Sequence, residues 1–273
     1  MQFSLNFHQT FAPEKEAIAQ LVQLASKTND YLSKEEISAI TTIPTGQRSG
    51  KVEPNILYCQ AMGLINVHKK GATYSIRLTP LGEVIVREDP FFTETLTHWL
   101  CHYNLCTLNS PAAMWSYIFN TIIPSAGFEL DQQFLENALS KYFNVSNINT
   151  TPFRTCYTTE KSFRDLGILE IEKKKYLFRQ HQPNRVFKYL YAYSLISEWE
   201  QVFPHQTELT YDHVRKDLGF GMPFLWDDFI TMDVLDILQE ERVILINRQL
   251  SPITLVKQAS SKMLLGKIYS FLI

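Results

Sequence analysis

Apolar side chains recur at helical spacing along the first third of the chain. Between Glu14 and Lys27 they fall on one face, which predicts a helix of ordinary length. Ser33, with Glu36 three residues later, is the capping signature of a second, shorter helix. A third helix is predicted from about residue 54 to residue 61. Three helices in close succession indicate a compact unit with a helix-turn-helix at its centre.

The hydrophobic period then changes from that of a helix to that of a strand. Residues 64–68 and 74–78 alternate apolar and polar side chains around a tight turn, which predicts a β-hairpin. A helix-turn-helix followed by such a hairpin is typical of a winged helix, which can bind a DNA duplex through its helix and its hairpin. Winged helices also serve as protein-docking or structural modules, so the pattern alone leaves the function open.

The same order of elements returns after Gly127. A second unit is predicted from helices at 130–143 and about 152–166 and from strands at 169–171 and 176–179. A weaker third unit is predicted from helices at 209–218 and 229–242 and from strands at 243–248 and 253–256. The repetition predicts tandem modules of one kind.

We therefore predict a mainly α protein with small β-hairpins, of the α+β class, in which tandem winged-helix modules are joined by a helical hairpin. The predicted domains are an N-terminal winged helix at 1–88, a helical connector at 89–126, a second winged-helix-like domain at 127–182 and a mostly helical domain at 183–273 that holds the weaker third unit.

Both ends of the chain carry apolar patterns of their own. Residues 3–11 alternate apolar and polar side chains, which predicts an edge strand or an extended arm packed on the first domain. Residues 262–273 predict an apolar helix that packs against the body of the protein or against a second subunit in a homodimer.

Composition restricts the classes of function. With 273 residues, of which 45% are hydrophobic, the chain can bury a sizeable core. Its net charge of -2 shows no overall basic excess, so a nucleic-acid surface would have to be a local patch. Four cysteines without a disulfide framework and the lack of an apolar run of about 20 residues predict free thiols, no membrane span and a cytoplasmic location.

Basic and amide side chains on both predicted modules are the candidate contacts to double-stranded DNA. On the first module they are Arg48, Lys51, Asn55, Lys69, Lys70 and Arg77. On the second they are Arg154, Lys161, Arg164, Lys173, Lys174 and Lys175. The alternative for each lysine is that it only keeps a turn soluble.

Residues 46–51 approach the phosphate-binding loop of ATPases without matching it. Gly46 and Gly50 are one residue too close, and Val52 stands where the motif needs Ser or Thr to hold magnesium. The sequence therefore excludes an ATP site here. The loop is either an anion site for a DNA phosphate or a solvated segment, and the pattern favours neither.

Two further groups look superficially like metal or catalytic sites. His98, Cys101, His102 and Cys106 share one predicted helix, which cannot surround a zinc ion tetrahedrally, so we predict that they are core residues. Asp165, Glu170, Glu172 and Lys174 approach a nuclease pattern, but on a hairpin they are more typical of a solvated wing. We identify no cofactor and no catalytic residue; Mg²⁺ would be needed only for a nuclease.

The order and spacing of short motifs along nearly the whole chain resemble an uncharacterised bacterial family of DNA phosphorothioation and anti-phage clusters. The motifs are Phe7-His8-Gln9-Thr10-Phe11, Met62-Gly63-Leu64-Ile65, Leu78-Thr79-Pro80-Leu81-Gly82, Asp89-Pro90, Trp99-Leu100-Cys101-His102-Tyr103 and Trp115 with Tyr117, Phe119 and Asn120. The family includes proteins similar to SspB, a DNA-nicking component. Gln9 departs from the Glu of many members, which would remove an acid role at that position.

The resemblance implies a part in replacing a backbone phosphate oxygen by sulfur. Three readings follow for this chain. The first is a double-stranded DNA-binding component that acts with sulfur-transfer partners. The second is a Mg²⁺-dependent nicking endonuclease of the same system. The third is a scaffold that binds only protein, such as a cysteine desulfurase or a phosphoadenosine-phosphosulfate-reductase-like enzyme.

Overall fold

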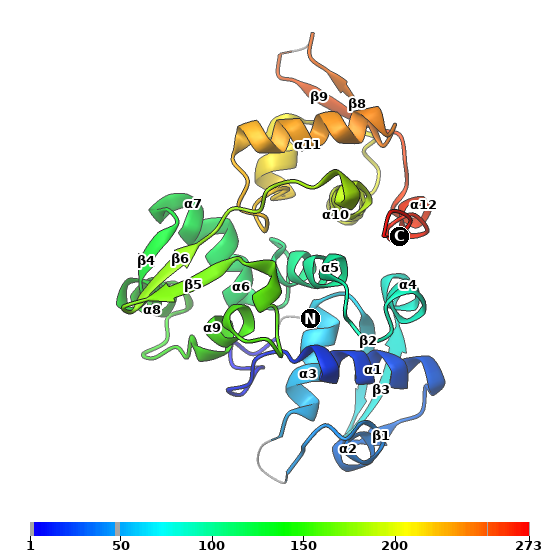
Figure 1. Cartoon of the computed structure of the whole chain (residues 1–273), viewed down its shortest axis with the longest axis vertical. Helices are drawn as coiled ribbons and strands as arrows, with labels where there is room; N and C mark the ends of the chain where they lie inside the picture. The colour runs from blue at the N-terminus through cyan, green and yellow to red at the C-terminus, as the bar shows by residue number, and fades with distance from the viewer. Residues whose placement is uncertain (1–2, 47–49, 250, 273) are drawn as a thin grey trace.

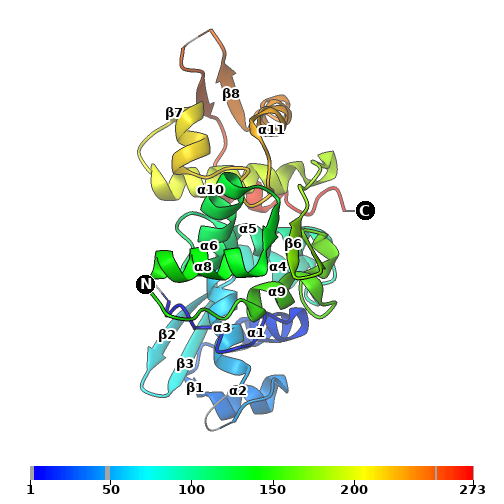
Figure 2. The same ribbon diagram turned by 90° about the vertical axis from the view of Figure 1, so that its left-hand side faces the viewer.

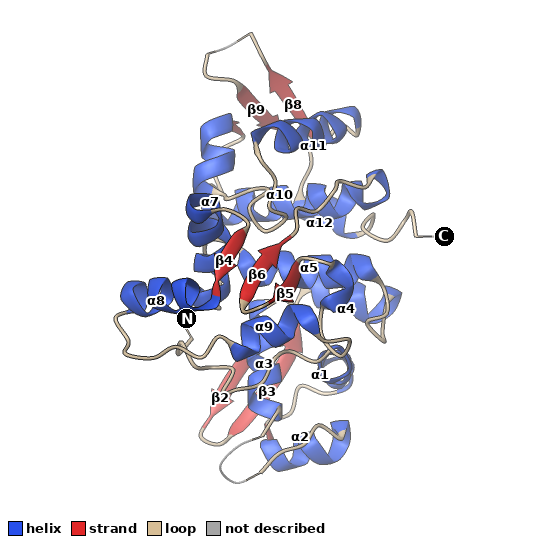
Figure 3. Cartoon of the chain, turned by 60° about the vertical axis from the view of Figure 1, so that its left-hand side comes forward, coloured by secondary structure: helices blue, strands red, loops and turns tan. Residues whose placement is uncertain are grey.

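The chain folds into three successive units that share one order of elements, stacked along the long axis of the molecule (Figure 1). This computed structural model describes residues 3–46, 50–249 and 251–272. Each unit contains a small antiparallel sheet of three strands, and helices separate the sheets (Figure 3). The fold is therefore mixed α and β.

The first unit agrees with the helix and hairpin pattern of the sequence. It consists of α1 (Lys15–Lys27), β1 (Leu32–Ser33), α2 (Lys34–Thr41), α3 (Val52–Ala61), β2 (Ile65–Lys70) and β3 (Thr73–Leu78), with strand order β1-β3-β2. The predicted capping box is present: the Glu36 amide donates to Ser33 Oγ at 3.2 Å, and the Ser33 amide donates to Glu36 Oε2 at 2.7 Å.

The second unit repeats the first with strand order β4-β6-β5. It begins with α6 (Ala113–Tyr117), which continues through a π-helical turn (Ile118–Ile122) into α7 (Ile123–Ala126). It goes on with β4 (Glu129–Asp131), α8 (Gln132–Phe143), α9 (Thr151–Thr158), β5 (Leu169–Glu172) and β6 (Lys175–Phe178). Helix α9 ends earlier than predicted, because the chain turns at 159–163 before a short 3₁₀ segment.

The third unit has the same order and the strand order β7-β9-β8. It consists of α10 (Lys188–Val202), β7 (Glu208–Thr210), a short helical segment at His213–Asp217, α11 (Asp228–Glu240), β8 (Ile244–Asn247) and β9 (Thr254–Lys257). Its hairpin projects at the top of the molecule (Figure 2).

Helix α5 (Thr95–Cys106) lies in the middle of the stack, between the first unit and α10 (Figure 1). Ten of its twelve residues are buried, and they include all four members of the suspected His and Cys group. The prediction that this group is core is confirmed, and the four cysteines of the chain are free and buried. Helices α4 (Pro80–Glu88) and α12 (Ser261–Leu265) complete the fold.

Further details differ from the sequence prediction. The helix predicted at 209–218 is instead the strand β7 followed by a five-residue π-helical segment at His213–Asp217, because residues 208–210 pair with β9. Residues 5–10 form turns rather than a strand, with Gln9 in a left-handed conformation at φ 55°. The C-terminal helix is limited to α12, and residues 266–271 form turns. The strands β1, β4 and β7 were not predicted, because two or three residues are too few to show a period of two.

Candidate functional site

The predicted DNA contacts at the start of α3 are mostly engaged with the protein itself. Lys51 Nζ lies 2.6 Å from Glu14 Oε1, so its charge is already paired. Asn55 is fully buried, accepts a hydrogen bond from the Glu14 amide and donates one to the Lys51 carbonyl. Arg48 lies outside the described residues. Asn55 therefore orders the start of α3 rather than offering a surface group.

Helix α3, which occupies the place of the reading helix, has no exposed residue. The N-terminal turns cover it: Tyr58 donates a hydrogen bond to the Phe11 carbonyl, and its ring contacts the rings of Phe7 and Trp115. A helix covered in this way cannot enter a major groove without displacing the segment above it.

The corresponding helix of the third unit, α11, is exposed but acidic. It begins at Asp228 beside its capping residue Asp227, and it ends at Glu240 and Glu241. Several of its carboxylates are paired, Asp228 with Arg215, Glu240 with Arg185 and Glu241 with Lys188. The helix therefore presents no free positive charge to DNA phosphates. Neither α3 nor α11 is suited to reading bases.

The β2–β3 hairpin carries exposed positive charge. Lys69 is paired with Glu53, at 3.0 Å, and lies over the Tyr74 ring. Lys70 and Arg77 are exposed, and no ion pair joins either of them to another described residue. These two cations are free to meet an anion.

The β5–β6 hairpin is the second basic projection. Lys173 and Lys174 form its turn, both with positive φ, at 46° and 69°. Lys175 pairs with Glu129 on the neighbouring strand β4. Figure 1 shows this sheet at the left-hand side, at mid-height, and the β2–β3 hairpin at the lower right, so the two basic hairpins occupy separate places.

The remaining candidate cations lie on or after α9. Arg154 is half-buried, Arg164 is paired with Glu160 at 3.1 Å, and Lys161 is exposed. Of these, Lys161 reaches the cavity described next.

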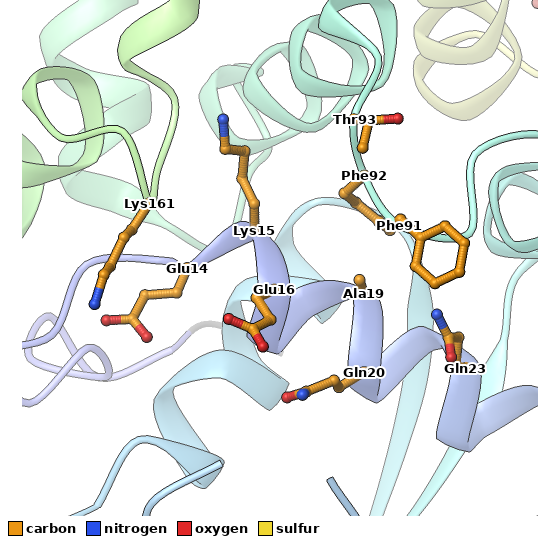
Figure 4. A pocket seen from close by; sticks show the side chains of 10 residues that line it. All are labelled: Glu14, Lys15, Glu16, Ala19, Gln20, Gln23, Phe91, Phe92, Thr93 and Lys161. Atoms are coloured by element: carbon orange, nitrogen blue, oxygen red, sulfur yellow. The ribbon is translucent and has the colours of Figure 1, made fainter. Parts of the chain in front are cut away.

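A cavity of about 710 Å³ lies between the start of α1, the loop before α5 and the loop after α9. Figure 4 shows the Lys161 side chain extending toward Glu14, with Glu16 beside them and Phe91 at the far end. The site therefore holds both signs of charge. It lies where the first and second units meet.

Beneath this cavity an ion cluster joins three elements that are distant in sequence. Asp165 contacts Lys15 Nζ, at 3.2 Å, and His98 Nδ1. Burial opposes ionisation of Asp165, but the hydrogen bond from His98 and the charges of His98 and Lys15 outweigh it and hold the pKa of the carboxyl below its ordinary value. The His98 Nε2 atom faces the Phe92 carbonyl oxygen at 2.7 Å. Asp165, Lys15 and both ring nitrogens of His98 thus have hydrogen-bond or ion-pair partners. The cluster joins the first and second units and leaves none of these groups free to act as a nucleophile.

A second buried histidine, His102, also has a hydrogen-bond partner at each ring nitrogen. His102 Nε2 donates to the Pro223 carbonyl at 2.7 Å, and the Tyr157 hydroxyl donates to His102 Nδ1 at 2.8 Å. This arrangement requires the neutral imidazole. Burial lowers the pKa of His102 to about 3.

The nuclease-like residues of the sequence do not come together. Asp165 is held by His98 and Lys15, whereas Glu170 pairs with Arg179 at 3.0 Å. Among the residues that the structure describes, no three His, Cys, Asp or Glu side chains are grouped to hold a metal ion. The donor set of the described residues therefore does not fit a Mg²⁺ centre built from side chains.

Sequence reasoning missed two acidic groups that matter here. Glu14 neutralises Lys51, and Glu198 on α10 is buried. Neither belongs to a motif, and the partners and the burial come from distant parts of the chain. No helix among the described ranges is long and apolar enough to cross a membrane.

Comparison with known proteins gives the fold and the family. Two solved structures, described as "SspB crystal structure" and "Magnesium ion-bound SspB crystal structure", match with TM-scores of 0.74 and 0.76. Each is 14% identical, and each match covers 97% of this chain and 86% of the other. The protein thus has an SspB-like fold. No curated protein matches it. A family model described as "Protein of unknown function (DUF4007)" matches residues 5–156, which is more than half of the chain, and the chain therefore belongs to the DUF4007 family.

Proposed function

We propose that this protein is the double-stranded DNA-binding component of a DNA phosphorothioation and anti-phage system. The likeness to SspB over 97% of the chain carries the proposal, because it extends the resemblance of the sequence motifs to the whole fold. The partners in this proposal are sulfur-transfer proteins of the cysteine desulfurase and phosphoadenosine-phosphosulfate-reductase-like kinds.

The three units are, in this proposal, tandem winged helices. Each has the helix, strand, helix, helix and hairpin order of that module, and in each the first strand pairs with the last. The predicted boundary at residue 127 would move back to about 113, because α6 and α7 take the place in the second unit that α1 has in the first.

The DNA contact in this proposal goes through the hairpins to phosphates. Lys70, Arg77, Lys173 and Lys174 are exposed on the two hairpins, whereas α3 is covered and α11 is acidic. Phosphate contacts position a protein without reading bases. We therefore expect binding with a steep salt dependence and little sequence preference.

Replacing Lys69, Lys70 and Arg77 together by alanine should weaken duplex binding several-fold and flatten its salt dependence. Each phosphate contact that is lost lowers the slope of log affinity against log salt by about 0.9. Fluorescence anisotropy with a labelled duplex at several salt concentrations measures both quantities.

A charge-matched control replaces Arg242, Lys262 and Lys267 by alanine. These are exposed cations of the third unit and the C-terminal segment, and no ion pair joins them to another described residue. This variant should keep the wild-type affinity. Equal losses in the two variants, or a wild-type protein that does not bind a duplex, would contradict the proposal.

A nicking endonuclease of the same system is the second candidate, because one of the similar SspB structures is described as magnesium-bound. It predicts conversion of supercoiled plasmid to open circles with Mg²⁺ and not with a chelator. The scaffold reading is favoured by one other feature: Phe229, 74% exposed, lies on the acidic helix α11.

A further inference from the structure

A second polar cavity lies where the first unit meets α10, at the base of the β2–β3 hairpin. Its inner part has a volume of about 290 Å³ and opens into an outer part of about 540 Å³. The two parts share the lining residues Gln60, Gly63, Asn109, Ser110, Pro111 and Gln201. An inner volume near 300 Å³ is at the lower end of the range of small-ligand sites.

The lining is rich in amides and hydroxyls and has a single charged side chain. That side chain is Glu198, which is only 6% exposed, and no lysine or arginine lines either part. A phosphate group therefore has no counter-charge here. The cavity suits an uncharged part of a ligand, one that donates hydrogen bonds.

Glu198 lacks the partner that a buried carboxylate needs. Its Oε2 atom is buried and makes no hydrogen bond to any described residue. Two neighbours are also unpartnered: the Tyr103 hydroxyl on α5, and Ser194 Oγ one turn earlier on α10. Burial raises the pKa of Glu198 to about 7, which reflects the cost of an unpaired buried charge.

The groups that surround Glu198 match the edge and the faces of a base. Carboxylate and amide side chains are the groups that pair with the amino and ring N–H groups of bases. Tyr193 and Pro111 also line the inner part, and an aromatic side chain is a group on which a planar base can stack. Guanine presents two N–H donors side by side, which one carboxylate can accept together.

We propose that this cavity binds a guanine base, with the Glu198 carboxylate accepting hydrogen bonds from its ring N–H and amino groups. This inference deepens the proposed DNA function and rests on it for its biological meaning. The N–H groups concerned pair with cytosine in a duplex, so the cavity would take a guanine that is unpaired or turned out of the helix. This contact would add to the sequence-independent phosphate contacts of the hairpins. It names a base site at the base of the β2–β3 hairpin, lined by none of the exposed cations that would hold phosphates. The sugar and backbone would leave through the outer part of the cavity.

The test is titration of the protein with guanosine and with inosine, which lacks the 2-amino group, at pH 8 by calorimetry. Guanosine should bind, and inosine should bind at least tenfold more weakly, because one donor to Glu198 is missing. Glu198→Gln should reduce guanosine affinity at least tenfold. Glu208→Gln, an equivalent change at an exposed strand position, should not alter it.

The comparison of guanosine with inosine uses the wild-type protein. It therefore tests recognition of the 2-amino group even if the Glu198 variant folds poorly. Equal binding of guanosine and inosine, or no binding of guanosine, would overturn the inference. So would saturation of the site by Mg²⁺ alone with loss of guanosine binding.

The hairpin experiment separates this inference from the proposed function. The Lys69, Lys70 and Arg77 variant should keep wild-type guanosine affinity while its duplex affinity falls. Guanosine binding by a protein that does not bind a duplex would overturn the proposed function and leave the base site standing.

Discussion

Gly82→Ala should lower the free energy of unfolding by about 3 kcal/mol or more. A Cβ at this residue would lie 2.1 Å from the Leu64 carbonyl oxygen and 3.2 Å from Leu78 Cδ2. The oxygen cannot move away cheaply, because it accepts a hydrogen bond from the Thr79 amide at 3.0 Å. Helix α4 would therefore have to separate from the base of the β2–β3 hairpin. Urea denaturation followed by tryptophan fluorescence measures the loss.

Gly266→Ala is the matched control for this prediction. A Cβ there meets nothing closer than 4.0 Å, and the backbone φ of -69° suits any residue. Its stability should stay within about 1 kcal/mol of wild type, on the stabilising side. Equal unfolding midpoints for the two variants would contradict the close approach at Gly82.

Lowering the pH from 6.5 toward 4.5 should destabilise the protein by on the order of 3 kcal/mol per pH unit at the steepest point. Burial lowers the pKa of His8 to about 4, of His102 to about 3 and of His181 to about 4, from 6.5. The unfolded chain therefore takes up these protons first as the pH falls. The stability that the three neutral rings provide is complete above pH 6.5 and is lost as the pH falls toward their folded-state pKa values.

Glu198 acts in the opposite direction. Burial raises its pKa to about 7. The stability that its protonated form provides is therefore complete below pH 4.5 and is lost as the pH rises through 7. Its change in stability with pH, about 1.4 kcal/mol per pH unit, is opposite in sign to that of one histidine and cancels it. Two of the three histidine contributions therefore remain. Urea denaturation at pH 7.5, 6.5, 5.5 and 4.5 gives the slope.

Two variants test the assignment of this slope. His8→Gln should reduce it by about 1.4 kcal/mol per pH unit, whereas the same change at the exposed His205 should leave the curve unaltered. A stability that does not vary between pH 6.5 and 4.5 would show that the buried histidines do not govern acid unfolding.

The spacing of apolar side chains predicted helices and strands well where an element was long enough to show its period. The capping residues Ser33 and Glu36, the hairpin of β2 and β3 and the burial of His98 and His102 all agree with the sequence. The strand β1 was missed, because two residues carry no period and it forms only by pairing with β3. The N-terminal segment packs on the first unit as predicted, with Phe7 against Tyr58. Its predicted extended conformation was wrong, because Gln9 turns the chain at a positive φ, which alternation does not reveal.

The candidate site depended far more on contacts between distant residues. The sequence identified Lys51 and Lys69 as cations but could not show that Glu14 and Glu53 neutralise them. Nor could it show that the N-terminal turns cover α3, or that α10 brings Glu198 to a cavity shared with Gln60. Charge is a local property of a residue, whereas its availability to a ligand depends on its partners.

By itself, the sequence determined the order of helices and hairpins in the first two units and indicated the last helix and hairpin of the third, because a few neighbouring residues are enough to show a helical or strand period. Only the tertiary structure decided which of those elements face solvent. The reason is physical: burial and ion pairing join residues as far apart as Lys15 and Asp165, and no local period records such a contact.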